Sequence, residues 1–299
     1  MTVFLTGANG FIGKNVLEKL LYKNIKIIAL VRDRKKMEEF IEKFSPKTYL
    51  RNLELIEGDL LLPESYYSKL KNVDIVINLV GIRKENQKKG ITFWKYNFET
   101  AKQLVRVSLE NNVKRFLQLS TIGASGTTKY EYFLTKYKAE KYVVESFENW
   151  IIVRPSIVIG PEGTFTKKIY SYLKLGIVPI PGDGNYKLQP ISITTLSNFI
   201  SYIATEEKIT KKEFNLLGPK EYTFNELIDT FSEIIKKKNY IKLHLSPNLI
   251  KILSKIVGDK ILLLSIEEIE TFSKIFNYWT DETKPIKNIP IEEEIKKLR

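Results

Sequence analysis

The stretch that decides the fold is Thr2-Val3-Phe4-Leu5-Thr6-Gly7-Ala8-Asn9-Gly10-Phe11-Ile12-Gly13, at the start of the chain. Its apolar, β-branched beginning is typical of a buried strand, and the three glycines then predict a tight turn. A helix is predicted at Gly13–Tyr22, because Val16, Leu17, Leu20 and Leu21 fall on one helical face. Amides at the N-terminus of a helix that follows such a loop favour an anion.

Short β-branched runs alternate with amphipathic stretches through the first half of the chain. Strands are predicted at Val3–Thr6, Ile25–Val31, Leu53–Ile56, Asp74–Leu79, Arg115–Ser120 and Ile151–Arg154, and a further helix at Asn97–Glu110. Strands that are buried on both faces and joined by helices imply a parallel sheet. We therefore predict an α/β fold, a doubly wound parallel Rossmann sheet with a smaller, mainly helical C-terminal lobe.

The pattern changes after Arg154, where proline- and glycine-rich loops surround a predicted helix at Lys167–Leu175. We expect the substrate crevice in these loops. Later residues are mainly helical, apart from a short apolar strand near Glu213–Leu217. We predict a sheet domain at residues 1–160, and substrate-side loops with a C-terminal lobe at 161–299, interleaved with the sheet up to about residue 220.

Composition excludes several classes of function. The chain of 299 residues has no cysteine, which excludes disulfides and thiolate chemistry, and its one histidine, His244, excludes a multi-histidine metal site and indicates a structural role. The net charge of +13 comes from scattered lysines, so we expect no nucleic-acid partner. We find no signal-peptide pattern and no apolar run long enough to span a bilayer, and expect a cytoplasmic protein.

The glycine positions have distinct predicted tasks. Gly7 permits the turn, Gly10 lets the backbone approach a pyrophosphate, and Gly13 allows close packing of helix on strand. The strand, loop and helix together predict a dinucleotide site, which makes residues 1–160 an NAD(P)-binding domain. Its predicted loop contacts are Gly7, Asn9, Gly10, Phe11, Ile12 and Gly13.

The sequence TGANGFIG strongly resembles the loop of the extended and atypical short-chain dehydrogenase/reductases. That resemblance implies further cofactor contacts. Asp59, followed by Leu60, is similar to the family's acid that meets the adenine amino group, although a turn cap is the alternative. Gly81 matches the turn that passes beneath the adenine ribose, and Pro155 begins a loop similar to the one that closes around nicotinamide.

The end of the second predicted strand bears on the choice of cofactor. An acid there binds a ribose 2′-hydroxyl, whereas an arginine accommodates a 2′-phosphate. Arg32 stands at that place, directly before Asp33. These residues favour NADPH and leave NAD as the alternative cofactor; a solvated helix start at residues 32–36 is the other interpretation.

A reductase of this kind needs a proton donor and a cation that lowers its pKa. Tyr132 and Lys136 supply that pair at a spacing that puts both on one helix face, and Lys136 could also hold the nicotinamide ribose. Thr121 takes the place of the family's serine that orients a substrate carbonyl, and the neighbouring Ser120 is the alternative for that role. The motif recurs as Tyr137 and Lys141, but Thr135-Lys136-Tyr137-Lys138-Ala139-Glu140 resembles the family's S-K-x-x-A-E and favours the first copy.

Two further motifs give expectations about structure. Asn97 is expected to open a helix, where the family's asparagine organises a proton-relay water. The segment from Gln189 to Ile193 resembles the family's substrate-side motif, but Thr194 and Thr195 stand where an acid usually follows. The substrate class therefore goes no further than a carbonyl or sugar-like small molecule, and the oligomeric state is not predicted.

Within the family, the chain most resembles bacterial relatives of the NAD(P)-binding accessory subunit of respiratory complex I. Two functions stay open at this point. One is NAD(P)-dependent oxidoreductase or epimerase chemistry by Thr121, Tyr132 and Lys136. The alternative is a non-catalytic NADPH-binding protein, or an NADP-sensing regulator, that contacts a respiratory complex or the surface of the inner membrane, with the amphipathic stretch Pro247–Leu264 as a membrane contact.

Overall fold

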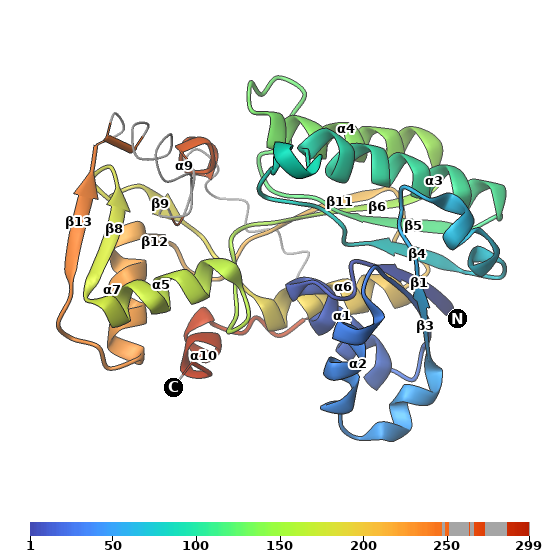
Figure 1. The fold of residues 1–299 in the computed structure, drawn as a ribbon, viewed down its shortest axis with the longest axis horizontal. Coiled ribbons are helices and arrows are strands. Elements are labelled where there is room, and N and C mark those ends of the chain that lie inside the picture. Colours follow the sequence, from blue (N-terminus) through green and yellow to red (C-terminus); the bar gives the residue numbers. More distant parts are fainter. Residues whose placement is uncertain (247–248, 251–262, 264–265, 273–285, 299) are drawn as a thin grey trace. The chain divides into compact units, whose positions relative to one another are not determined.

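The computed structural model describes residues 1–246, 249–250, 263, 266–272 and 286–298 (Figure 1). The chain divides into two compact units. Unit 1 is Met1–Arg154 with Ser197–Phe214, and unit 2 is Pro155–Leu196 with Asn215–Arg299. Each unit is therefore assembled from two separate segments of the chain. Most of the Pro247–Leu264 stretch lies outside the described residues.

A seven-stranded sheet forms the centre of unit 1, in the order β11-β6-β5-β4-β1-β2-β3. The strands from β1 to β6 pair in parallel. Their bounds are β1 Thr2–Thr6, β2 Lys26–Val31, β3 Leu53–Glu57, β4 Ile75–Asn78, β5 Arg115–Leu119 and β6 Asn149–Pro155, with β11 at Lys212–Leu216. The predicted strands and the predicted α/β sheet are confirmed.

Helices cover both faces of this sheet (Figure 1). One face carries α1 (Phe11–Tyr22) and α2 (Arg34–Glu42), and the other carries α3 (Thr100–Glu110) and α4 (Glu131–Ser146). Short helical turns complete the connections: η1 Lys47–Asn52, η2 Pro63–Ser65, η3 Tyr67–Leu70 and η4 Gln87–Lys89. On the side of α3, strand residues such as Phe4 and Phe116 are completely buried against Leu104 and Val143. Each such side chain contributes about 1.5–3 kcal/mol to folding.

The helix that was expected to begin at Asn97 starts earlier. Asn97 lies inside a π-helical turn, η5 (Trp94–Glu99), which runs directly into α3, and Phe93 already has helical backbone angles. The prediction that Asn97 opens the helix was wrong, because its amide does not serve as an N-cap. It bonds the backbone at Ile82 instead. A π-helical turn often marks a functional site.

The late segment of unit 1 is tied to the sheet by one buried arginine. Arg115, at the start of β5, is 7% exposed. Its guanidinium donates to the carbonyl oxygens of Ala204, Ile203, Glu206 and Ile209 at 2.9 to 3.1 Å. These acceptors lie at the end of α6 (Ile193–Thr205) and just after it. The segment that returns at Ser197 is thus part of the fold of unit 1.

The described residues of unit 2 form helices and three two-stranded pairs. The pairs are β7 (Val158–Ile159) with β10 (Ile191–Ser192), β9 (Lys187–Leu188) with β12 (Tyr222–Thr223), and β8 (Ile177–Pro181) with β13 (Ile241–Leu245). The helices are α5 Thr164–Leu175, α7 Phe224–Ile234, α9 Ile266–Phe272 and α10 Ile291–Lys296, with the start of α6. Within the described ranges, no helix has the length and apolarity that a membrane span requires.

The acid that the substrate-side motif lacks is supplied from the other end of the chain. Glu294 of α10 is fully buried, and its Oε1 accepts a hydrogen bond at 3.3 Å from the backbone N–H of Thr194, in the first turn of α6. Lys297 reaches the other carboxylate oxygen at 2.7 Å. A carboxylate near a helix N-terminus is electrostatically favourable. The motif therefore has Thr194 in place of an acid, and the carboxylate at this position is that of Glu294.

Candidate functional site

The glycine loop has the geometry that its spacing predicts. Gly7 has φ +74°, a left-handed conformation, and a Cβ on it would lie 3.0 Å from the backbone of Leu79. A Cβ on Gly13 would lie 2.0 Å from the carbonyl oxygen of Gly7, so only glycine lets α1 approach the loop. Gly10 is the N-cap of α1 and supplies no capping side chain. The first-turn amides of α1, from Phe11 to Gly13, therefore remain available to an anion.

A cleft of about 350 Å³ opens beside this loop at the carboxyl ends of the strands. Seven of the predicted cofactor residues line it: Gly7, Asn9, Gly10, Arg32, Asp59, Leu60 and Gly81. Asn9 joins the loop to the second strand, because its Nδ2 donates to the carbonyl oxygen of Asp33 at 3.0 Å. In the described part of the chain its buried Oδ1 has no hydrogen-bond partner. An unpaired buried acceptor in a residue that lines the cleft is consistent with a polar ligand there.

Two cations and one acid stand at the end of β2. Arg32, Asp33 and Lys36 all line the cleft. The carboxylate of Asp33 caps α2 by accepting from the N–H of Lys36 at 3.2 Å, and the ammonium of Lys36 lies 3.5 Å from its other oxygen. The exposed guanidinium of Arg32 lies 5.6 Å from the centre of the Tyr96 ring. Lys36 thus compensates the negative charge of Asp33, whereas the guanidinium N–H groups of Arg32 can donate to a ligand.

Asp59 has the capping role that was considered as an alternative. Its Oδ1 accepts from the N–H of Leu61 at 2.9 Å, in the turn that follows β3. Asp59 also lines the cleft with Leu60. The two interpretations are compatible, because a carboxylate has two oxygens and the turn uses one.

Lys136 lies beside Gly81, which lines the cleft, but Lys136 itself is not a lining residue. A Cβ on Gly81 would come within 2.8 Å of the Lys136 Nζ and 3.2 Å of the Asn97 Oδ1, so the absent side chain leaves room for both. The ammonium donates to the carbonyl oxygen of Leu119 at 3.0 Å, at the end of β5. Burial lowers the pKa of Lys136 to about 8, although the charge of Glu140 opposes the shift. Removal from water favours the neutral amine.

A chain of buried hydrogen bonds crosses the sheet to the same carbonyl. The Thr6 hydroxyl donates to Asn78 Oδ1 at 2.7 Å, the Asn78 amide donates to Gln118 Oε1 at 2.9 Å, and the Gln118 amide donates to the Leu119 oxygen at 2.9 Å. All three side chains are buried. This chain links β1, β4 and β5 to Lys136. Gln118 has no local sequence signal for this role, since Asn78, which donates to it, lies on another strand.

The two copies of the tyrosine–lysine motif have different surroundings. Tyr132 lies in the first turn of α4, where its ring packs edge-on against Phe93 at 5.5 Å between ring centres. In the second copy, Lys141 is exposed and lies 3.6 Å from Glu145, one turn further along the same helix. The ring of Tyr137 lies against Gly126. Only the first copy has a buried lysine.

The remaining predicted residues lie at strand ends. Thr121 is buried two residues after β5, and its hydroxyl donates to the carbonyl oxygen of Ile122 at 3.2 Å. Pro155 is the buried last residue of β6 and falls in unit 2. Just before it, Arg154 bonds both oxygens of the buried Glu140 at 2.9 and 2.5 Å, and also reaches Glu213 at 2.6 Å. The family-like segment that ends at Glu140 thus meets the residue before Pro155 in an ion pair with little exposure.

Several cleft residues carry no motif that could have identified them. Tyr96, Thr100 and Lys36 line the cleft with the predicted residues. Tyr96 belongs to the π-helical turn, which sequence patterns do not indicate, and Thr100 follows it. Lys36 falls only within the alternative interpretation of the sequence, a solvated helix start at residues 32–36. In the described part of the chain, no cluster of histidine and acidic residues could hold a metal ion.

Comparison with known proteins agrees with this geometry. Residues 7–171 match the family described as NAD(P)H-binding. A curated relative, the mitochondrial NADH-ubiquinone oxidoreductase 40 kDa subunit of Neurospora crassa, is 26% identical over 279 residues, which cover 90% of this chain and 69% of the relative.

Two solved structures share the fold. One is the Citrobacter sp. triphenylmethane reductase complexed with NADP(H), with a TM-score of 0.74 and 18% identity over 99% of this chain and 100% of that chain. The other is the UDP-glucose 4-epimerase of Thermotoga maritima with UDP-glucose, with a TM-score of 0.73 and 19% identity over 99% of this chain and 96% of that chain. The match over more than half of its residues shows that this chain belongs to the NAD(P)H-binding family, and most of its length is similar to the 40 kDa subunit of Neurospora crassa.

Proposed function

We propose that this chain is an NADPH-dependent oxidoreductase or epimerase that acts on a carbonyl or sugar-like small molecule. The observation that carries the proposal is Lys136. Its ammonium is buried beside Gly81, holds the end of β5 through the Leu119 carbonyl and has a pKa of about 8. Ionisable groups with such strongly shifted pKa values are concentrated at functional sites.

The residues of the loop and of the β2 end would hold the cofactor. Gly7, Gly10 and the first-turn amides of α1 would face the pyrophosphate, and Arg32 with Lys36 would face a 2′-phosphate. When bound, the nicotinamide supplies or accepts the hydride. Asp33 does not oppose a 2′-phosphate strongly, because its carboxylate already caps α2 and pairs with Lys36.

In this proposal Tyr132 transfers a proton to or from the substrate oxygen, and the Lys136 ammonium stabilises the phenolate that results. Thr121 donates its hydroxyl to the substrate carbonyl. To do so, the hydroxyl must turn away from the Ile122 oxygen, which it now meets at 3.2 Å. That exchange replaces one neutral hydrogen bond by another and costs little.

The cofactor preference can be tested by titration of the purified chain with NADPH and with NADH, followed by fluorescence. We expect NADPH to bind more tightly, and we expect Arg32→Ala to lose about tenfold or more in NADPH affinity with little change for NADH, because a charge-assisted phosphate contact contributes about 1.5–3 kcal/mol. Arg34→Ala is the matched control, since Arg34 is exposed and pairs with Glu38 on α2. Equal losses for both cofactors would contradict the assignment of Arg32.

The proton relay can be tested by Tyr132→Phe, with Tyr137→Phe as the control from the second copy of the motif. We expect Tyr132→Phe to bind NADPH like the wild type and to lose carbonyl reduction by at least about a hundredfold, which is the usual contribution of a positioned acid or base. The measurement is NADPH consumption with a panel of aldehydes, ketones and nucleotide sugars. If Tyr137→Phe is the inactive variant instead, the relay belongs to Tyr137 and Lys141.

One specific observation favours a second candidate function. The Neurospora crassa relative, which matches 90% of this chain, is named as a subunit of an NADH-ubiquinone oxidoreductase. The second candidate is thus a non-catalytic NADPH-binding protein that associates with a respiratory complex or a membrane surface. It shares the cofactor site with the first candidate and differs in the relay: tight NADPH binding without turnover of any carbonyl in the panel would favour it.

A further inference from the structure

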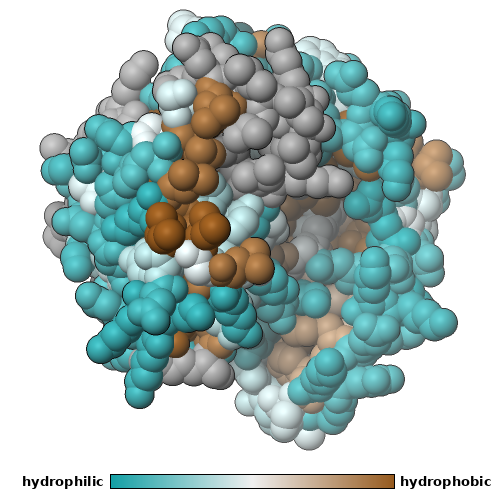
Figure 2. Space-filling model, turned by 60° about the vertical axis from the view of Figure 1, so that its left-hand side comes forward, coloured by the Kyte–Doolittle hydropathy of each residue, from teal (hydrophilic) through white to brown (hydrophobic). Residues whose placement is uncertain are grey.

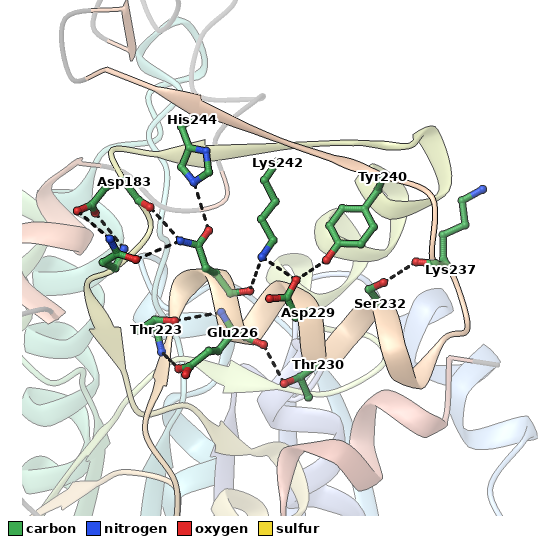
Figure 3. Close-up of polar contacts among 12 residues, drawn as sticks. Asp183, Thr223, Glu226, Asp229, Thr230, Ser232, Lys237, Tyr240, Lys242 and His244 are labelled. Carbon is green, nitrogen blue, oxygen red and sulfur yellow. Dashed lines mark hydrogen bonds and ion pairs between the residues drawn. The ribbon is translucent and has the colours of Figure 1, made fainter.

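In unit 2, the polar side chains of strand β13 contact helix α7. Tyr240, just before the strand, donates its hydroxyl to Asp229 of α7 at 2.5 Å, and the Lys242 ammonium lies 2.6 Å from the same carboxylate oxygen. His244 reaches the side chain of Asn225, at the start of α7, at 3.3 Å. Figure 3 shows these contacts along one side of the strand. The even-numbered side chains therefore anchor β13 on α7.

On the opposite side of the strand, Ile241 and Leu243 are exposed, whereas Leu245 at the end of the strand is buried. Side chains alternate along a strand, so Ile241 and Leu243 point away from α7. Ile241 pairs with Ile177 of the neighbouring β8. Ile241 is 66% exposed, Leu243 49% and Ile177 51%, and Leu175, which ends α5 just before β8, is 75% exposed. Figure 2, which brings this side forward, shows a band of hydrophobic surface with hydrophilic residues beside it.

We call these four residues, Leu175, Ile177, Ile241 and Leu243, the outer patch. Its arrangement reverses the usual alternation, in which the apolar side of a strand faces the core and the polar side faces water. Scattered apolar residues on a surface are ordinary, but adjacent ones on one sheet face indicate an interaction site. Three polar contacts to α7 accompany this orientation, two of them to the same Asp229 oxygen.

Lysines border one end of the outer patch. The N–H of Ile241 donates to the Gly176 oxygen at 2.9 Å, which holds the chain before β13 beside the end of α5. Lys174 in the last turn of α5 and Lys236 and Lys238 in the turn after α7 are all exposed. In the described residues none of these three is in an ion pair, although the Lys174 ammonium lies 4.4 Å from the centre of the Tyr170 ring, and Glu233 is the last acid of α7 before the turn.

We propose that the outer patch docks on an anionic lipid surface, with its aliphatic side chains in the headgroup region and Lys174, Lys236 and Lys238 on the lipid charges. Aliphatic residues with a basic border suit such an interface. Charge argues against a second copy as the occupant, because two chains of net charge +13 would bring six lysines together. The proposal extends the second candidate function, but it involves only residues of unit 2 and does not depend on the dinucleotide cleft.

The test is co-sedimentation of the full chain with vesicles of phosphatidylcholine alone and of phosphatidylcholine with phosphatidylglycerol. We expect binding to the anionic vesicles. Ile241→Ser/Leu243→Ser should abolish it, and Lys236→Gln/Lys238→Gln should weaken it by about fivefold per lysine, since each surface lysine contributes about 1 kcal/mol. Leu175→Ser is a third variant that changes only a largely exposed side chain and so keeps the fold.

Matched controls come from α3 and the turn that follows it in unit 1. Leu109→Ser replaces a leucine that is 44% exposed, and Lys102→Gln/Lys114→Gln removes the same charge from exposed positions. All variants should retain the wild-type response to NADPH, which reports a folded unit 1. The proposal is overturned if the wild-type chain does not sediment with anionic vesicles, or if the patch variants sediment like the controls. It is also overturned if light scattering shows a dimer that Leu175→Ser dissociates while no vesicles are bound, because the occupant is then a second copy.

Loss of vesicle binding leaves the NADPH titration unaffected, and loss of NADPH binding in Arg32→Ala leaves the outer patch unaffected. The two proposals therefore fail separately.

Discussion

At the scale of single residues, Lys136 has the most demanding environment in the site. Its ammonium is buried, and it donates a hydrogen bond to a neutral acceptor, the carbonyl oxygen of Leu119. That acceptor is itself fixed by Gln118, through the hydrogen-bond chain that begins at Thr6. The spacing of Tyr132 and Lys136 predicts a shared helix face. It does not predict which lysine is buried, because burial depends on strands more than fifteen residues away in sequence.

The pH dependence of stability should reveal this buried amine. Its pKa of about 8 lies below the ordinary value of 10.5, so between these values the unfolded chain binds more protons and the free energy of unfolding rises with pH. Lys136→Met has no such titration. We therefore expect the free energy of unfolding of Lys136→Met, relative to wild type, to fall by about 3 kcal/mol between about pH 7 and about pH 10.5.

Urea unfolding at several pH values measures that difference, and Lys141→Met on the same helix is the control, since Lys141 is exposed. A difference that stays constant for Lys136→Met across the whole range would show that the amine is hydrated in the folded chain.

At the scale of elements, the first half of the fold follows from sequence pattern. The strands from β1 to β6 are short apolar runs that need burial on both faces, and this signal is strong in a single sequence. The π-helical turn η5 has no such signal, because the sequence around Asn97 satisfies an ordinary helix pattern. The reversed strand β13 was also not predicted. Its alternation of apolar and polar residues marks two faces, but only the contacts with α7 decide which one is turned outward.

The junction between β1 and α1 gives a prediction that separates packing from ligand binding. A Cβ on Gly13 would lie 2.0 Å from the Gly7 oxygen, whereas a Cβ on Gly10 would meet the same atom at 3.1 Å. We expect Gly13→Ala to displace α1 and to destabilise the chain by roughly 1–3 kcal/mol, as overpacking does. Gly10→Ala should cost less than about 1 kcal/mol and should still weaken NADPH binding, because a methyl group then stands where the pyrophosphate approaches.

Both variants are compared in two measurements. Thermal unfolding in the absence of cofactor gives the change in stability, and titration with NADPH gives the change in affinity. Wild-type affinity in Gly10→Ala would show that the pyrophosphate does not pass over this glycine.

At the scale of the whole molecule, the chain leaves unit 1 after Arg154 and returns to it for Ser197–Phe214. The sequence pattern predicted a short apolar strand near Glu213–Leu217, and the structure places this strand, β11, at the edge of the seven-stranded sheet. What no pattern indicates is the means of attachment. Arg115 is polar in a run that was predicted as a buried strand, and its four carbonyl acceptors are about ninety residues away. Glu294 is a similar case in unit 2, where an acid from the C-terminal helix serves a helix that begins a hundred residues earlier.

Arg115 therefore provides a test of how strongly the returning segment is held. In Arg115→Ala the carbonyl oxygens of residues 203, 204, 206 and 209 lose a shared donor inside the protein, and a large side chain leaves a cavity. We expect a loss of about 3–5 kcal/mol in the free energy of unfolding, from buried groups left unpaired and lost packing. Arg106→Ala on α3 should cost less than about 0.5 kcal/mol, because its side chain is 57% exposed and lies 3.9 Å from Glu110. Hydrogen exchange then locates the effect: increased exchange confined to residues 197–214 and the adjoining β6 would show that this segment opens as a unit, whereas uniform exchange over the whole of unit 1 would show that Arg115 stabilises the sheet globally.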